Sequence, residues 1–256
     1  MVTATFRFYA ELNDFLAPPR RYRAFSAPCA RAATTKHMIE ALGVPHTEVE
    51  LILVNGESVG FDRLIADGDR IAVYPKFECF DVTPLLRVRE RPLREPRFVA
   101  DAHLGGLARL LRMAGFDTLY DNNFDDAEIV ALAARDGRIV LTRDRELLKR
   151  REVTHGCFVH ALKPEKQVRE VFARLDLARG ARPFRLCLEC NAPLRPVDKA
   201  LVADRLPPSV RERQQRFTTC DACGGVFWEG SHWQRMSALL DELVAPAGAD
   251  AQKWQT

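Results

Sequence analysis

The hydrophobic positions of the first eighty residues fall into short runs that predict strands around one helix. Residues 3–10 alternate apolar and polar side chains, which is the period of a half-buried strand. Glycine, proline and aspartate separate this run from those that follow it. The further elements expected here are a hairpin partner over residues 21–25, a helix over 35–42 and strands over 50–54 and 70–74.

The order strand, strand, helix, strand, strand predicts an N-terminal ubiquitin-like β-grasp module over residues 1–80. Residues 54–57 and 67–75 resemble parts of the small sulfur-carrier β-grasp proteins. Those carriers need a free C-terminal Gly-Gly, whereas this chain continues through residues 76–80 without one. Sulfur transfer is therefore disfavoured, and we expect a packing, docking or regulatory module whose partner the sequence does not identify.

In the central segment, residues 97–180, apolar runs alternate with helical patterns. This alternation predicts an α/β domain with a mainly parallel sheet. Helices are expected over 104–114, from 125 to 136, over 146–149 and from Pro164 onward. Strands are expected over 98–100, 116–120, 139–141 and 157–160.

Three aspartates stand where such a sheet would bring them together. Asp101 and Asp144 each follow a strand, and the carboxyl ends of parallel strands share one edge, where open α/β sheets bind ligands. Asp126 stands at a helix start, which often returns to that edge. Three converging carboxylates repel one another unless a cation neutralises them, and oxygen ligands suit Mg²⁺ or Mn²⁺. The alternative makes Asp126 a helix cap and the other two turn formers.

Four of the seven cysteines form two Cys-x-x-Cys pairs. Four thiolates satisfy one tetrahedral Zn²⁺ in a closed structural site, so we expect a zinc ribbon over residues 183–236. A redox role for one pair would not explain the other. The expected zinc ligands are Cys187, Cys190, Cys220 and Cys223.

Charge and composition say less about the function than the motifs do. The 256 residues carry a net charge of +3, but arginines crowd just before Asp101 and around Asp144, where they suit a polyanion or simply a solvated face. Prolines and arginines over residues 81–96 predict an extended linker, and residues 245–256 predict a disordered tail. No apolar run is long enough for a membrane span and no secretory signal is visible at the N-terminus, so we expect a cytoplasmic protein.

Several stretches resemble a known family. Residues 126–129 and 135–144 resemble the second half of a PIN-type nuclease domain. With residues 100–112 they resemble the PIN-like RNase family named after the C-terminal domain of the Mut-seven exonuclease. That family appends a zinc ribbon and often carries a β-grasp module in front, and the resemblance extends to about Met236.

The resemblance implies that Asp101, Asp126 and Asp144 are the metal-binding catalytic acids of a PIN-like domain. PIN domains usually have a further acid before the helix start. Asp121 and Asp125 occupy that interval, and neither stands on a matching motif. The leading hypothesis is a Mg²⁺- or Mn²⁺-dependent ribonuclease acting on single-stranded or structured RNA. The alternative is an RNA-binding or adaptor protein on a PIN-like scaffold with weak or lost catalysis.

The sequence indicates the residues that would contact the substrate less specifically than it indicates the metal-binding acids. Arginines would neutralise the RNA backbone, and histidines would touch the substrate or act structurally. Tryptophans 228 and 233 suit either base stacking or cover of the zinc module. Gly105 and Gly106 suit either phosphate approach or close helix packing. The candidate substrate-binding residues are Arg109, Arg143, Arg145, His103 and His232.

Overall fold

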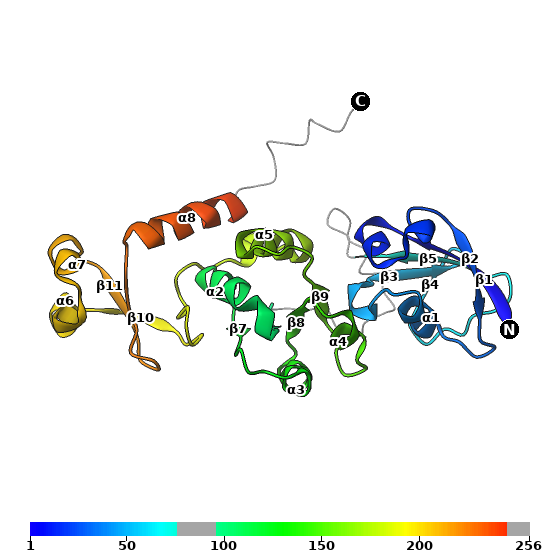
Figure 1. Ribbon diagram of the computed structural model, residues 1–256, viewed down its shortest axis with the longest axis horizontal. Helices are drawn as coiled ribbons and strands as arrows, with labels where there is room; N and C mark the ends of the chain where they lie inside the picture. The colour runs from blue at the N-terminus through cyan, green and yellow to red at the C-terminus, as the bar shows by residue number, and fades with distance from the viewer. Residues whose placement is uncertain (76–95, 245–256) are drawn as a thin grey trace, which may run out of the picture. The chain divides into compact units, whose positions relative to one another are not determined.

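The structure is a computed structural model that describes residues 1–75 and 96–244 (Figure 1). The chain divides into two compact units. The first comprises residues 1–103 and 123–160, and the second comprises residues 104–122 and 161–256. The expected tail over 245–256 and nearly all of the expected linker over 81–96 lie outside the described residues.

The N-terminal part of the first unit is a ubiquitin-like β-grasp, as the order of its elements predicts. Its five-stranded sheet has the order β2-β1-β5-β3-β4, with β1 and β5 parallel and the other neighbours antiparallel. The alternating side chains of β1 bury Ala4, Phe6 and Phe8 in one core. The elements are β1 (Val2–Phe8), β2 (Phe25–Cys29), α1 (Thr35–Ala41), β3 (Leu51–Val54), β4 (Glu57–Val59) and β5 (Arg70–Tyr74).

The expected hairpin partner over residues 21–25 is wrong in position, because β2 begins only at Phe25. The connection from β1 is not a tight turn but two 3₁₀ turns, Ala10–Phe15 and Pro18–Arg20. The buried Asn13 organises it. Its side-chain amide donates to Phe8 O and Ala10 O, and its Oδ1 accepts from the backbone N–H of Tyr22. Tyr22 adopts a left-handed conformation, which ends any strand there.

The rest of the first unit is the parallel sheet that the alternating pattern predicts. Strands β6, β8 and β9 are neighbours and run parallel, and their residues are largely buried. Asp125 caps α3 reciprocally with Glu128, and Gly137 ends the helix in the left-handed conformation. The elements are β6 (Phe98–Ala100), α3 (Asp126–Asp136), β8 (Ile139–Thr142), α4 (Arg145–Lys149) and β9 (Gly156–Phe158).

Within the first unit, the ubiquitin-like part packs against β9 and its flanking residues. Phe158 lies against the N-terminal core, and its ring meets that of Phe15 edge-on with centroids 5.4 Å apart. Buried His46 donates from Nε2 to Val153 O at 2.9 Å, and its Nδ1 lies 2.7 Å from a Glu40 carboxylate oxygen. These contacts make one compact body from segments far apart in the sequence.

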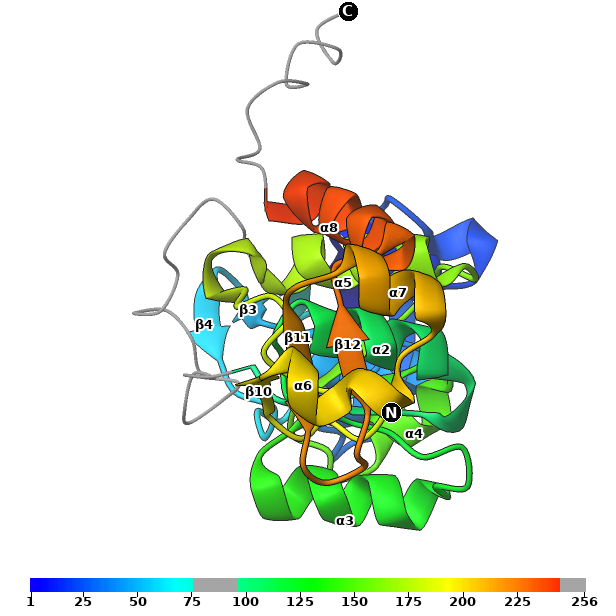
Figure 2. The ribbon, with the colours of Figure 1, turned by 90° about the vertical axis from the view of Figure 1, so that its left-hand side faces the viewer.

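The second unit holds two packed helices followed by a three-stranded antiparallel sheet of order β10-β11-β12 (Figure 2). Helix α2 packs on α5, while Val202, Leu206 and Phe217 form a small core beneath the sheet. The elements are α2 (Gly105–Met113), β7 (Thr118–Leu119), α5 (Pro164–Leu175), β10 (Leu194–Val197), α6 (Lys199–Val202), α7 (Pro208–Arg213), β11 (Phe217–Cys220), β12 (Val226–Trp228) and α8 (Ser231–Val244).

The helices found in residues 1–75 and 96–244 include none with both the length and the apolar character that a membrane crossing requires.

Candidate functional site

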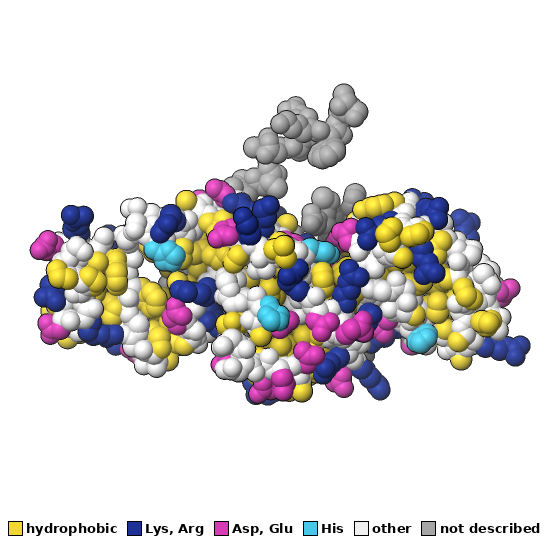
Figure 3. All heavy atoms as spheres, viewed as in Figure 1, with side chains coloured by type: hydrophobic (Ala, Val, Ile, Leu, Met, Phe, Trp, Pro, Cys, Tyr) yellow, Lys and Arg dark blue, Asp and Glu magenta, His cyan; other side chains and the backbone are white. Residues whose placement is uncertain are grey.

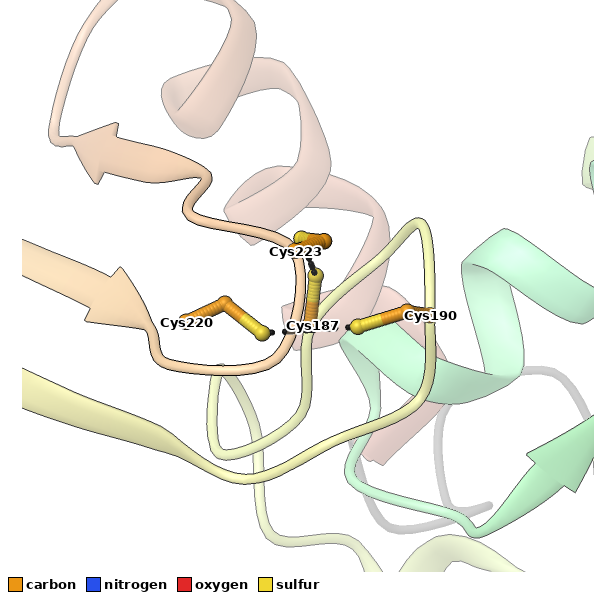
Figure 4. A group of neighbouring side chains, drawn as sticks. All are labelled: Cys187, Cys190, Cys220 and Cys223. Carbon is orange, nitrogen blue, oxygen red and sulfur yellow. Dashed lines mark hydrogen bonds between the residues drawn. The ribbon is translucent and has the colours of Figure 1, made fainter.

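The four paired cysteines converge on one point of the second unit (Figure 4). The Sγ atoms of Cys187 and Cys223 are 3.6 Å apart, those of Cys190 and Cys220 are 3.4 Å apart, and all four lie within 4.8 Å of one another. Tetrahedral zinc with Zn–S bonds of about 2.3 Å requires S–S separations of about 3.8 Å. The donor set and its spacing therefore fit Zn²⁺.

Both cysteine pairs lie on turns of the same construction. In the first, the backbone N–H of Asn191 donates to Cys187 O at 3.0 Å, and in the second that of Gly224 donates to Cys220 O at 2.8 Å. Asn191 and Gly224 both have positive φ, +66° and +73°, so each turn depends on a residue that tolerates the left-handed region. Two equivalent turns present four sulfur atoms to one centre.

The environment of Cys187 determines the charge of its thiol. Burial raises the pKa of the Cys187 thiol to about 12. A thiol in that environment stays protonated until a bound metal stabilises its thiolate, which is the form that coordinates zinc.

A buried arginine, Arg112, fixes the first cysteine turn to α2. Its Nε donates to Thr118 O at 2.9 Å, and its Nη1 donates to Leu188 O and Glu189 O at 3.0 and 2.7 Å. Burial lowers the pKa of this guanidinium from its ordinary value. The contact was missed at the sequence level, because an arginine in the last turn of a helix ordinarily faces solvent.

Asn191 adds a second tie between this turn and β7. Its Oδ1 accepts from the Thr118 N–H at 3.0 Å, and its Nδ2 donates to Asp117 at 2.6 Å. The zinc ribbon is thereby joined to the helical part of the second unit by hydrogen bonds as well as by the chain.

In the first unit, Asp101 and Asp144 lie at the carboxyl ends of β6 and β8, as their positions after two strands predict. The buried Thr142 links them. Its hydroxyl donates to Asp101 Oδ2 at 2.6 Å and accepts from the Asp144 N–H at 2.9 Å. Asp144 also caps α4 by accepting from the Glu146 N–H at 2.8 Å. The turn-forming role that the sequence left open for Asp144 is therefore present in the structure.

Asp126 lies in the first turn of α3, where its Oδ2 pairs with Arg150 at 3.0 Å. Among the described residues, the four cysteines are the one His, Cys, Asp or Glu group close enough together to share an ion. The structure therefore joins Asp101 and Asp144 through Thr142 and gives Asp126 a cationic partner. Acidic and basic side chains both lie on the surface around α3 and α4 (Figure 3).

The candidate substrate contacts fall into different settings. His103 and Arg143 are exposed beside Asp101 and Asp144. Arg145 is half-buried instead, with its guanidinium 5.0 Å from the Phe15 ring centre and 5.5 Å from that of Phe158.

Two further candidates belong to the second unit. Arg109 and His232 line one cleft, and Arg109 pairs with Glu189 at 2.8 Å.

The two glycines at the start of α2 serve close packing. A Cβ on Gly105 would lie 2.6 Å from the Tyr120 hydroxyl, and one on Gly106 would lie 2.5 Å from Pro164 Cγ. Of the two roles open at the sequence level, the structure shows the packing role, since each glycine touches a large side chain of the second unit.

These features define a class of protein: a ubiquitin-like module, a parallel α/β sheet with strand-end aspartates, and a four-cysteine ribbon. Residues 96–240 match the family model of the Mut7-C RNAse domain, and residues 1–81 match that of the Mut7-C ubiquitin. The chain belongs to the Mut7-C RNAse domain family and carries its ubiquitin-like module at the N-terminus.

Comparison with solved structures finds the small archaeal modifier protein 1 of Haloferax volcanii in two crystal structures. Each is 18% identical over 30% of this chain, with a TM-score of 0.25, and the match covers 100% and 99% of the two archaeal chains. No curated protein matches the chain.

Proposed function

We propose that this protein is a ribonuclease that hydrolyses RNA phosphodiester bonds at a Mg²⁺ or Mn²⁺ site held by Asp101, Asp126 and Asp144. The observation that carries the proposal is the linkage of Asp101 and Asp144 through Thr142 at the ends of two parallel strands. The match to an RNAse domain family over the same residues supports it.

The donor set fits a hard divalent cation. Hydrogen bonds engage Oδ2 of Asp101 and Oδ1 of Asp144, which leaves the other oxygen of each carboxylate to face an ion. When bound, such an ion activates water and stabilises the charge that develops on a phosphodiester. Carboxylate oxygens, rather than thiolates, are the ligands that Mg²⁺ and Mn²⁺ prefer.

The chain's own residues have distinct parts in this proposal. Thr142 orients the Asp101 carboxylate and the backbone of Asp144, so that both stay at one strand-end edge. Arg143 is exposed next to Asp144 and would bind a backbone phosphate. Arg150 pairs with Oδ2 of Asp126, so Oδ1 of that carboxylate would serve the ion. The cysteine site would hold structural Zn²⁺. Its reduced thiols suit a reducing compartment such as the cytoplasm.

One observation favours a second function, an RNA-binding adaptor with weak or lost catalysis. Asp126 is paired with Arg150, and the three aspartates do not form a ready cluster among the described residues. In that case the exposed arginines, not the acids, would carry the function.

A cleavage assay separates the two functions. The full chain is incubated with labelled single-stranded and structured RNA, with Mn²⁺ or with EDTA. We expect Mn²⁺-dependent cleavage that falls on the order of 100-fold or more in Asp144→Asn, because an electrostatic group at the reacting phosphate is lost. Asp14→Asn, an exposed aspartate in the ubiquitin-like part, is the matched control and should cleave as the wild type does. Cleavage that survives both EDTA and Asp144→Asn would contradict the proposal, and binding without cleavage would favour the adaptor.

A further inference from the structure

A cleft in the second unit is lined mainly by apolar side chains, and five of them are aromatic. It has a volume of about 870 Å³ and lies among β11, β12, the segment before the first cysteine turn and the start of α8. Hydrophobic side chains gather over this part of the chain in Figure 3, with Lys and Arg side chains beside them. The aromatic residues of the lining are Phe184, Phe217, Phe227, Trp228 and Trp233.

Two of these rings stack on each other. The centroids of Phe184 and Trp233 are 5.1 Å apart with an interplanar angle of 30°. Both side chains are half-buried, as is that of Trp228. Trp228 also packs against the small core of Val202, Leu206 and Phe217, so part of its ring is covered there. The parts of the three rings that remain exposed line the cleft.

The charge of the cleft complements an anion. Arg109, Arg216 and His232 line it together with one acid, Glu229. Residues 182–236 contain nine Lys and Arg against six Asp and Glu, and Arg216 is exposed. Accessible aromatic faces next to arginines are the combination that holds unstacked bases and their phosphates.

The size of the cleft agrees with a short stretch of nucleic acid. Pockets of roughly 300–1,000 Å³ enclose ligands of drug size, a class that includes one or two nucleotides. A duplex would not enter, because its bases are stacked on one another and present only their edges.

We propose that this cleft, which we call the aromatic cleft, binds unpaired bases of single-stranded RNA. Trp228 and the Phe184–Trp233 stack receive the bases, while Arg216 and Arg109 contact the phosphates. The proposal rests on the proposed function, since it supplies a holding site for the RNA on which the strand-end aspartates would act. It names unpaired RNA as the substrate class.

Binding of a fluorescein-labelled 12-nucleotide single-stranded RNA tests the aromatic cleft. Fluorescence anisotropy is measured with the zinc-loaded full chain in an Asp144→Asn background, which separates binding from cleavage. We expect Trp233→Ala to bind about 10-fold more weakly, because one stacking partner is lost, and Trp233→Phe to stay within about 3-fold of the parent. Tyr22→Ala is the control, since it removes an exposed aromatic side chain from the first unit, and should bind as the parent does.

A second variant protects the test against misfolding. Arg216→Gln leaves the aromatic rings in place, and we expect it to lower the slope of log Kd against log salt by about one, as loss of one phosphate contact does. The zinc content of every variant reports whether the ribbon is intact. A 12-nucleotide chain of abasic ribose phosphates and a 12-base-pair RNA duplex should both bind at least about 10-fold more weakly than the single strand.

Several outcomes would overturn the proposal. If Trp233→Ala retains zinc and binds RNA as tightly as the parent, the aromatic cleft does not bind RNA, and a protein partner becomes its expected ligand. An equal loss of binding in Tyr22→Ala would show that the loss in Trp233→Ala is not specific to the aromatic cleft. Failure of the ribonuclease proposal is distinguishable: RNA would then bind through Trp233 while the wild-type chain fails to cleave it with Mn²⁺. If RNA cleavage depends on Asp144 while RNA binding does not depend on Trp233, the aromatic-cleft proposal is refuted and the ribonuclease proposal stands.

Discussion

At the scale of single residues, the cysteine site depends on a few polar side chains outside it. Arg112 and Asn191 hold the first cysteine turn by hydrogen bonds to backbone groups of the turn and of β7. A buried guanidinium beside this site would also offset part of the negative charge of four thiolates that hold a zinc ion. The ligands themselves are therefore only part of what makes the site.

Replacement of Arg112 by lysine tests this dependence. Arg112→Lys keeps the charge but loses the planar fork that reaches three carbonyls, so we expect a loss of about 2–3 kcal/mol in the free energy of unfolding. Zinc affinity should fall about 10–100-fold, as when outer hydrogen-bonding partners of a metal site are removed. Thermal denaturation and zinc release to a chromogenic chelator measure the two effects.

Arg109→Lys is the matched control on the same helix. Arg109 pairs with Glu189 at the surface, where ion pairs contribute about 0–1 kcal/mol. It should leave zinc release unchanged. A wild-type zinc release rate in Arg112→Lys would show that the first cysteine turn does not need this guanidinium.

At the scale of elements, two glycines at the start of α2 allow neighbouring residues to pack closely against this helix. Gly106 is touched by Pro164 at the start of α5, and Gly105 by Tyr120. A helix that begins with two glycines has poor intrinsic propensity, so the close approach of α5 explains why they are tolerated.

Gly106→Ala should destabilise the second unit although alanine is the better helix former. The new Cβ would lie 2.5 Å from Pro164 Cγ, and forced overpacking costs about 1–3 kcal/mol against a propensity gain of at most about 1 kcal/mol. Urea denaturation of the full chain measures the change.

The double variant Gly106→Ala/Pro164→Ala provides the control for that prediction. If the contact is the cause, the double variant loses less than the sum of the two single variants. Strict additivity would instead attribute the effect to the helix itself.

At the scale of the whole chain, the ubiquitin-like module is built into the first unit. Phe15 is buried between the N-terminal core and Phe158, and Arg145 lies over both rings. Arg145 directly follows Asp144, so this packing reaches the first residue of α4 next to a proposed metal ligand. The module thus has a structural role in addition to any partner that it binds.

Phe15→Ala should therefore affect both stability and activity. Removing a buried phenylalanine costs about 3–5 kcal/mol, and we expect a lower melting temperature together with reduced RNA cleavage. Tyr22→Ala, at a side chain 69% exposed in the same segment, is the control and should stay within about 0.5 kcal/mol of the wild type. Full cleavage by Phe15→Ala at a temperature where the protein is folded would show that the module does not support the aspartate edge.

The sequence by itself determined the elements with clear periodicity and the chemistry with fixed spacing. The α/β alternation and the two Cys-x-x-Cys pairs are local patterns, and local patterns are set by the residues that form them. The cap of α3 was less well determined, because the structure caps the helix with Asp125 and not with Asp126. The strand-end positions of Asp101 and Asp144 also followed, because parallel strands share one edge.

The tertiary structure alone decided which residues meet across the chain. It shifted β2 to Phe25, since Asn13 organises a long connection that no periodicity reveals. It buried Arg112 against the cysteine turn, paired Asp126 with Arg150 and placed Arg145 on Phe15. Such contacts depend on packing between segments up to 130 residues apart, and a linear pattern carries no record of that geometry.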